Sequence, residues 1–323
     1  MVRRTTLVFL LLLLLDLAAF WLALSRGAVT IDPLAGWAGH LPDWQLTILE
    51  QLRLPRAVAG MTVGAMLGMA GVLMQVLLRN PLAEPYVLGI SGGAAVAALG
   101  SLLLGLSSFW VSGSAFIGSL ISMFMVFLLG GRQGETHSER LLLTGVVVAA
   151  GWGAMISFML AVGPDQSLRG MLFWLMGDLS RTSAPWWSIG VVFLALAAGW
   201  VMAPALDLLA RGDQQAAALG VEIHRLRASC YVTASLLTAC AVTLAGPIGF
   251  VGLVVPHLIR LVSGARHRVL MPASMLAGGA LLTLADTLAR TIIAPQQLPV
   301  GVLTAMIGVP LFLYLLRHQG VRG

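Results

Sequence analysis

The sequence predicts an all-α, polytopic membrane protein with about ten transmembrane helices. Of its 323 residues, 59% are apolar and only 10% are charged, whereas soluble domains carry about 25% charged residues. Many separate apolar runs approach the roughly 20 residues that a helix needs to cross a bilayer. These long, uniform runs lack the alternating pattern of β-barrel strands, so helices are the structure that satisfies the backbone in lipid. The composition excludes a soluble enzyme.

The first half of the chain contains five predicted spans. Arg3 and Arg4 precede an apolar stretch that is too long for a signal peptide and lacks a small-residue cleavage site, which favours a retained first span. In the second span Gly60, Gly64 and Gly68 recur every four residues, so another helix of the same bundle can approach that face closely. The spans are predicted near 7–25, 52–79, 87–106, 113–129 and 141–162.

The second half contains five more predicted spans, of which the third is short. Cys230 and Cys240 lie ten residues apart on one predicted helix, roughly 15 Å along its axis, so they cannot bridge and are interpreted as small core residues. Because each half contains five spans, an odd number, the second half would enter the membrane from the opposite side, which permits an inverted repeat. Residues 1–323 are treated as one transmembrane domain. The spans are predicted near 186–206, 226–246, 250–263, 270–292 and 300–316.

Arginine placement predicts the orientation. All 19 basic residues are arginines, and most fall on the cytoplasmic side if the N-terminus is cytoplasmic and the spans alternate. The positive-inside rule therefore predicts two cytoplasmic termini, and it explains the basic composition better than nucleic-acid binding does. Without lysine the chain cannot hold a standard P-loop. If ATP drives this protein, another subunit binds it.

Three of the six arginines on the predicted outer side stand out, because the orientation rule disfavours positive charge there. Arg53 and Arg56 flank Pro55 at the start of the second span, and Arg290 lies at the outer end of the ninth. Guanidinium groups collected at one face suit carboxylates on a docking partner. Snorkelling of arginines at the membrane interface is the alternative.

The longest cytoplasmic loop is predicted at about 207–227. Asp213 is interpreted as the N-cap of a short helix and Gly220 as its C-terminal stop. Such a helix is too short to be stable alone in water, so its small face, Ala216 to Ala218, is expected to insert into a groove on a partner. A surface helix resting on its own bundle is the alternative.

A polar turn is predicted after the second span, on the cytoplasmic side. Pro81 and Pro85 forbid a continuous helix there, so the chain must turn before it re-enters the membrane. A simple connector would show the same pattern.

No catalytic residue and no metal site is predicted. The sequence has no H-E-x-x-H and no C-x-x-C, and His257 is interpreted as a structural hydrogen-bonding residue. The few charges inside predicted spans include Asp16 in the first span and Asp286 near the end of the ninth. A proton- or sodium-coupled carrier usually places several ionisable groups near the midplane of the membrane. A secondary carrier or channel for a small solute nevertheless stays the leading alternative. An intramembrane enzyme is disfavoured.

Several motifs with fixed Pro, Gly and polar positions are spread in order over most of the chain. They are RLPR at 53–56, NPLAEP at 80–85, LGI at 88–90, LGV at 219–221, GPIGFVGLVVPH at 246–257 and LPVGVLT at 298–304. The stretch GPIGFVGLVVPH is the most specific of them, because apolar helices alone would not reproduce its Pro and Gly positions. Together these motifs resemble the FecCD-type permeases, the membrane subunits of ABC importers for ferric siderophores, haem and cobalamin.

The resemblance implies the fold of a type II importer in a bacterial inner membrane. Two such permeases, expected as a homodimer, would enclose one pathway above two ABC ATPase subunits that bind ATP and Mg, and a periplasmic binding protein would dock on the other side. The permease itself would bind no cofactor and hydrolyse nothing, and its cargo stays open between siderophore, cobalamin and haem.

The resemblance also assigns roles to residues at the two ends of the predicted bundle. It implies binding-protein docking at Arg53, Arg56 and Arg290. It implies ATPase coupling through Asp213, Ala216, Ala217, Leu219 and Gly220, and a cytoplasmic gate at Asn80, Leu82, Ser138 and Glu139.

Overall fold

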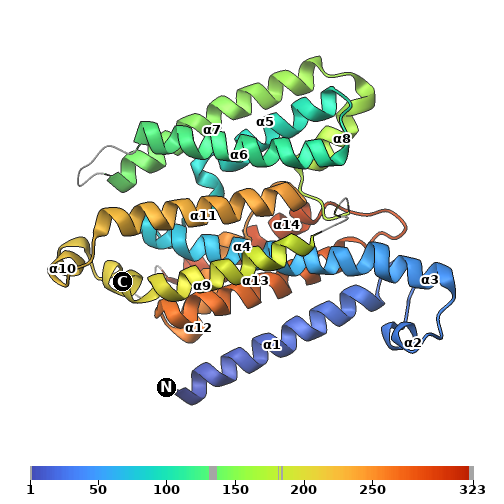
Figure 1. Cartoon of the computed structure of the whole chain (residues 1–323), viewed down its shortest axis with the longest axis horizontal. Coiled ribbons are helices and arrows are strands. Elements are labelled where there is room, and N and C mark those ends of the chain that lie inside the picture. Colours follow the sequence, from blue (N-terminus) through green and yellow to red (C-terminus); the bar gives the residue numbers. More distant parts are fainter. Residues whose placement is uncertain (1, 131–136, 181, 183–184, 320–323) are drawn as a thin grey trace.

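The computed structural model describes residues 2–130, 137–180, 182 and 185–319, and this part of the chain is helical without a β-strand (Figure 1). Ten apolar helices match the ten predicted spans. Seven are long and apolar enough to cross a membrane, while α5, α12 and the apolar part of α14 are shorter. The ten are α1 (Val2–Ser25), α4 (Leu54–Leu77), α5 (Ile90–Leu103), α6 (Ser108–Gly130), α7 (His137–Val162), α9 (Trp186–Leu209), α11 (Ile223–Ala245), α12 (Val251–Ser263), α13 (His267–Ala289) and α14 (Val300–Gln319).

Short helices mark the two ends of the bundle (Figure 1). The α10 end is named after the short helix between α9 and α11. The opposite end, called here the arginine end, holds the last turns of α1 and α13 and the start of α4. The short elements are α2 (Pro33–Trp37), α3 (Asp43–Thr47), the π-helix η1 (Ile48–Arg53), the 3-10 helix η2 (Pro85–Leu88), α8 (Asp165–Leu175) and α10 (Asp213–Ala218).

The centre of the bundle is α4, which is buried along nearly its whole length. Its glycine stripe faces α13: a Cβ at Gly64 would lie 2.1 Å from the carbonyl oxygen of Gly278, and one at Gly68 would lie 2.3 Å from that of Ser274. Gly71 meets Gly252 of α12 as closely. The stripe therefore packs helices within one chain, as predicted.

Replacing Gly64 with Ala should destabilise the bundle by about 1–3 kcal/mol or more, because the new methyl group meets backbone atoms that cannot move aside. The measurement is thermal unfolding of the purified protein in detergent. Gly113→Ala on α6 is the matched control: a Cβ there meets nothing within 4 Å, and the change favours helix formation. Equal unfolding temperatures for the two variants would contradict this account of the α4–α13 contact.

The two shortest apolar helices, α5 and α12, occupy corresponding places as the third span of each half. Both follow a residue in the left-handed region, Gly89 with φ 72° and Phe250 with φ 70°. At 1.5 Å per residue each is about 20 Å long, less than the roughly 30 Å hydrocarbon layer. Non-helical backbone before each of them therefore enters the depth of the bundle, and the correspondence favours an inverted repeat.

The third span begins later than predicted. The sequence places its start near residue 87, whereas α5 starts at Ile90, because 85–88 form a 3-10 turn and Gly89 adopts a left-handed conformation that interrupts the helix.

The outward faces of the bundle are apolar. Large side chains stand exposed on peripheral helices, among them Leu17 on α1, Val147 on α7 and Val201 on α9. Cys230 and Cys240 are buried in α11 and unbridged, as predicted. This distribution is that of a multi-pass membrane protein, whose apolar periphery faces lipid or another membrane subunit.

Candidate functional site

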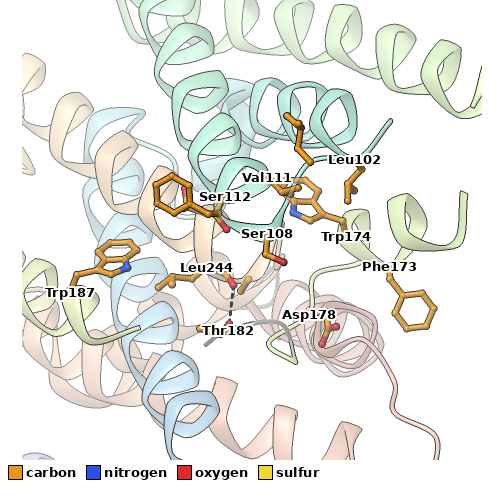
Figure 2. Close-up of a pocket in the computed structure, with 15 residues that line it drawn as sticks. Leu102, Ser108, Val111, Ser112, Phe173, Trp174, Asp178, Thr182, Trp187 and Leu244 are labelled. Atoms are coloured by element: carbon orange, nitrogen blue, oxygen red, sulfur yellow. Dashed lines mark hydrogen bonds between the residues drawn. The ribbon is translucent and has the colours of Figure 1, made fainter. Parts of the chain in front are cut away.

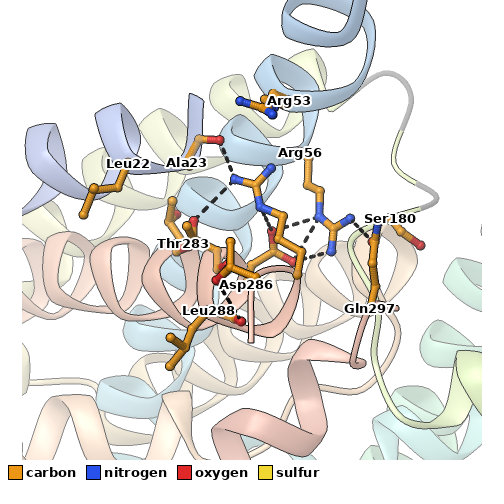
Figure 3. A network of polar contacts seen from close by, with 12 residues as sticks. Leu22, Ala23, Arg53, Arg56, Ser180, Thr283, Asp286, Leu288 and Gln297 are labelled. Carbon is orange, nitrogen blue, oxygen red and sulfur yellow. Dashed lines mark hydrogen bonds and ion pairs between the residues drawn. The ribbon is translucent and has the colours of Figure 1, made fainter. Parts of the chain in front are cut away.

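Arg53, Arg56 and Arg290 lie together at the arginine end, and the last two flank a carboxylate from α13, Asp286 (Figure 3). Arg56 Nε and Nη2 donate to the two oxygens of Asp286 at 2.8–3.1 Å, and Arg56 Nη1 donates to Gln297 Oε1 at 2.7 Å. Arg290 Nε lies 3.9 Å from the same carboxylate, and its Nη2 donates to the carbonyl oxygen of Ala23. The site thus joins the start of α4 to the ends of α13 and α1.

Within the part of the chain that the structure describes, Arg53 has no carboxylate partner, and its guanidinium binds backbone instead. Its Nη1 donates to the carbonyl oxygens of Leu24 and Ser25 at 2.7 and 2.9 Å, and its Nη2 donates to that of Val29. The helix α1 ends at Ser25, where its last carbonyls lack helical partners. The guanidinium of Arg53 therefore caps the C-terminus of α1 by bonding its last carbonyls, and it also fixes the segment that follows the helix.

The three guanidinium groups are largely buried: the exposed fractions of Arg53, Arg56 and Arg290 are 5%, 8% and 7%. Among the described residues, Asp286 is the one carboxylate that forms ion pairs with this group of three positive charges. All three arginines line a hollow of 370 Å³. The cluster is thus a positively charged surface at the base of an open hollow. Most of its guanidinium N–H donors form hydrogen bonds within the chain.

The sequence places Asp286 near the end of the ninth predicted span, and the structure agrees. It lies in the last turn of α13, in a bidentate ion pair with Arg56, 230 positions away in the sequence. The spacing of residues along the chain could not reveal that pairing.

At the α10 end, Asp213 is held between two arginines. It accepts hydrogen bonds from Arg227 Nη2 at 3.0 and 3.1 Å, and it forms an ion pair with Arg79. Arg79 follows α4, and Arg227 lies in the first turns of α11. The carboxylate consequently ties α10 to the second span of each half of the chain.

The predicted capping of α10 is wrong at its N-terminus. Gly212, with φ 120°, is the N-cap, and the side chain of Asp213 points to the arginines because they supply stronger donors than a free helix terminus does. Gly220 adopts a left-handed conformation just after the helix, as expected for its stop.

The small face of α10 is divided between the bundle and solvent. Ala216 is fully buried, so it packs against the bundle and is not free to insert into a partner. Ala217, Gly220 and Leu219 are exposed, Leu219 by 65%. The surface left for a partner is therefore centred on Ala217 and Leu219.

The predicted gate residues lie at the α10 end without forming one cluster in the described structure. Asn80 Oδ1 accepts the Leu82 N–H at 2.9 Å in a tight turn, and both residues are exposed. Glu139 is exposed in the first turn of α7, and the side chain of Ser138 lies outside the described residues. Their role as a gate stays a prediction.

Two residues that sequence reasoning leaves without a role join the halves of the chain. Glu84 Oε1 accepts the N–H of Phe250 at 2.7 Å, and the Tyr86 hydroxyl accepts that of Ile248 at 3.1 Å. Both acceptors precede α5, and both donors precede α12. We call these two contacts the interhalf bonds. The motifs at 80–85 and 246–257 contain three of the four residues. These motifs were therefore the sequence signal that could have pointed to the two contacts.

Glu84→Ala should destabilise the protein by about 1–3 kcal/mol, because it leaves the Phe250 N–H without its acceptor inside the bundle. Glu84→Gln keeps an acceptor oxygen and should lose less than half as much. Thermal unfolding in detergent measures both, with Glu139→Ala as an exposed-carboxylate control. If Glu84→Gln and Glu84→Ala destabilise the protein equally, the stabilisation depends on the carboxylate charge of Glu84 and not on its acceptor oxygen.

A second hollow, of 290 Å³, lies between α6, the segment after α8 and the end of α11 (Figure 2). Trp174, Trp187 and Phe173 line it, together with Ser108 and Ser112. Its carboxylate, Asp178, accepts the N–H of Ser180. Among the described residues no three His, Cys, Asp or Glu side chains are grouped to hold a metal ion.

Comparison with known proteins gives a consistent result over nearly the whole chain. The FecCD transport family matches residues 12–318. The chain is 42% identical to the cobalamin import system permease protein BtuC of Halobacterium salinarum, covering 91% of this chain and 80% of that one. It is 40% identical to the hemin transport system permease protein HmuU of Yersinia pestis, covering 98% and 96%. A solved metal-chelate type ABC transporter in an inward-facing conformation superposes with a TM-score of 0.83 at 29% identity, covering 97% and 99%.

Proposed function

We infer, because this chain belongs to the FecCD transport family, that it is the membrane permease of an ATP-driven importer for a metal chelate. The observation that carries the inference is the match to permeases of chelate importers over nearly the whole chain, in sequence and in fold. The proposed cargo is a cobalamin, a haem or a ferric siderophore. The partners are a second copy of this chain, two ATPase subunits that bind ATP and Mg, and a binding protein.

The α10 end is proposed to face the cytoplasm, and the arginine end to face the binding protein across the bacterial inner membrane. The chain begins at the α10 end, since α1 reaches the arginine end at its C-terminus, and both termini would be cytoplasmic. The positive-inside rule supports this orientation, because Arg211, Arg225, Arg266 and Arg268 all lie near the α10 end.

ATP binding in the partner subunits is proposed to act through α10. The exposed Ala217 and Leu219 supply the contact, and Asp213 passes a displacement of α10 to α4 and α11 together. ATP then biases which of two bundle arrangements is populated, while the permease supplies the arrangements.

Docking is proposed to depend on the electrostatic field of the arginine cluster. It is not proposed to depend on hydrogen bonds from the guanidinium N–H groups, which are largely engaged within the chain. The buried guanidinium groups carry more positive charge than Asp286 cancels, so the rim of the 370 Å³ hollow attracts acidic side chains of a binding protein. Charge reversal at Arg53 or Arg56 would test this poorly, because it would also unmake the contacts that hold α1 and α13.

Leu52 offers a cleaner test of docking, because it lines the same hollow and is 62% exposed. Leu52→Glu should weaken binding-protein affinity on the order of tenfold at low salt, since like charges would face each other. Leu52→Gln controls for the loss of apolar surface. Unchanged affinity of the Glu variant in nanodiscs, measured at several salt concentrations, would refute electrostatic docking at this hollow.

The function as a whole is tested by reconstitution. The chain, its ATPase and its binding protein are placed in proteoliposomes, and uptake of haemin, cyanocobalamin and a ferric siderophore is followed with and without ATP. We expect ATP-dependent accumulation of one of the three. Uptake that needs a proton or sodium gradient and no ATPase would instead support a secondary carrier. Against that alternative, Asp286, one of its two candidate coupling carboxylates, is already held by Arg56.

A further inference from the structure

The carboxyl group of Asp16 lies in the middle of α1, within the membrane-spanning part of the chain. Its residue is 8% exposed, so it is more than nine-tenths buried. Neither carboxyl oxygen has a hydrogen-bond partner in the described structure. The proposed transport mechanism gives this carboxyl group no role. An ionisable side chain at this depth is expensive unless something pairs with it.

Asp16 lines a groove of 450 Å³ between α1, α4, α9 and α13. That volume is within the usual range for small-molecule sites, about 300–1,000 Å³. The groove is hollow because small residues, Ala65 and Gly279, face it where larger side chains would fill it. In Figure 1, α1 runs along the outside of the bundle, so a molecule dissolved in the membrane can reach the groove from the side.

The walls of the groove are apolar and rich in groups that accept a cation. Phe20 and Phe193 supply aromatic rings, and Met61 and Met275 supply polarisable thioethers. None of the residues that line the groove is basic. Asp16 therefore has no counter-charge there, and its two oxygens can both accept hydrogen bonds from a ligand that brings several N–H donors.

We propose that this groove is a binding site for a lipophilic primary amine, whose ammonium group pairs with Asp16 and whose alkyl chain lies along α1 and α9. An ammonium offers three N–H donors and a positive charge. It can therefore donate hydrogen bonds to both unpartnered oxygens of Asp16 and also supply the missing counter-charge. A neutral alkyl chain would fill the volume and leave the carboxyl unsatisfied.

The test uses dodecylamine as the probe and dodecanol as its neutral counterpart. Native mass spectrometry of the purified protein, released from detergent micelles, counts the bound molecules per chain over a concentration series. We expect one saturable dodecylamine per chain and at least about tenfold weaker binding of dodecanol. Asp16→Asn keeps the size of the side chain and should reduce dodecylamine affinity by about tenfold or more, to the level of dodecanol.

Two further variants separate the site from the fold. Ala65→Leu narrows the groove and keeps the carboxyl, so it should weaken amine binding even if Asp16→Asn folds poorly. Leu14→Ala changes an exposed position of α1 that does not line the groove, and amine binding should persist. Equal binding of amine and alcohol by the wild type, or full amine binding by Asp16→Asn, would overturn the proposal and mark the groove as a place for lipid chains alone.

Discussion

Asp286→Ala is expected to lower the free energy of unfolding by about 3–5 kcal/mol, because it leaves the Arg56 guanidinium buried without its counter-charge. Both members of the pair are nearly inaccessible, with side-chain exposures of 9% and 4%. Arg290, which has the same carboxylate 3.9 Å away, would lose its neighbour too. The start of α4 and the end of α13 should then separate.

Thermal unfolding in detergent, together with the yield of monodisperse protein, measures this loss. The double variant Arg56→Met with Asp286→Leu should recover much of it, since apolar residues of similar volume tolerate burial without pairing. Glu50→Ala is the control, because Glu50 is an exposed carboxylate in the neighbouring η1 and its removal should change stability by less than about 0.5 kcal/mol. A mild effect of Asp286→Ala, comparable to that of Glu50→Ala, would show that the pair does not hold this end together.

Asp213→Ala should reduce ATP-dependent uptake on the order of tenfold while the partner ATPase remains active. The change frees Arg79 and Arg227 from α10, so a displacement of that helix no longer reaches α4 and α11. A coupling free energy of 1–3 kcal/mol corresponds to effects of about 5- to 150-fold. Uptake and ATP hydrolysis are measured in the same proteoliposomes, so that the loss appears in their ratio.

Glu222→Ala is the matched control for this experiment. Glu222 is a carboxylate of the same loop that pairs with Arg225 three residues on, and both side chains are exposed. Exposed pairs of this kind contribute about 0–1 kcal/mol, so uptake per ATP should stay as in the wild type. If Asp213→Ala and Glu222→Ala behave alike, the link through α10 is not the coupling route.

The positions of the helices could be predicted because each span is a local property of the sequence. Apolar runs locate all ten, and the stripe Gly60, Gly64 and Gly68 correctly indicates close packing within the bundle. The start of α5 was missed because a left-handed glycine, and not hydropathy, sets it. The end helices α2, α3 and η1 were missed because neither their length nor their hydropathy distinguishes them from loops.

The candidate sites were predicted less well, because their chemistry depends on long-range partners. Grouping Arg53, Arg56 and Arg290 at one end followed from topology, but their burial depends on Asp286 and on the carbonyls of α1. Likewise Asp213 resembles a helix cap in sequence, since Arg79 and Arg227 become its neighbours only when α4 and α11 pack side by side.

The interhalf bonds have a consequence for how an opening of the bundle can be observed. The amides of Ile248 and Phe250 are protected by side chains of the other half, whereas that of Val254 is protected by the carbonyl of Phe250 within its own helix. Exchange of amide hydrogen for deuterium needs the local bond to open. A separation of the halves that leaves every helix intact would accelerate exchange at Ile248 and Phe250 and spare Val254. Those two amides are thus built-in reporters of movement between the halves, and they can be followed without any label.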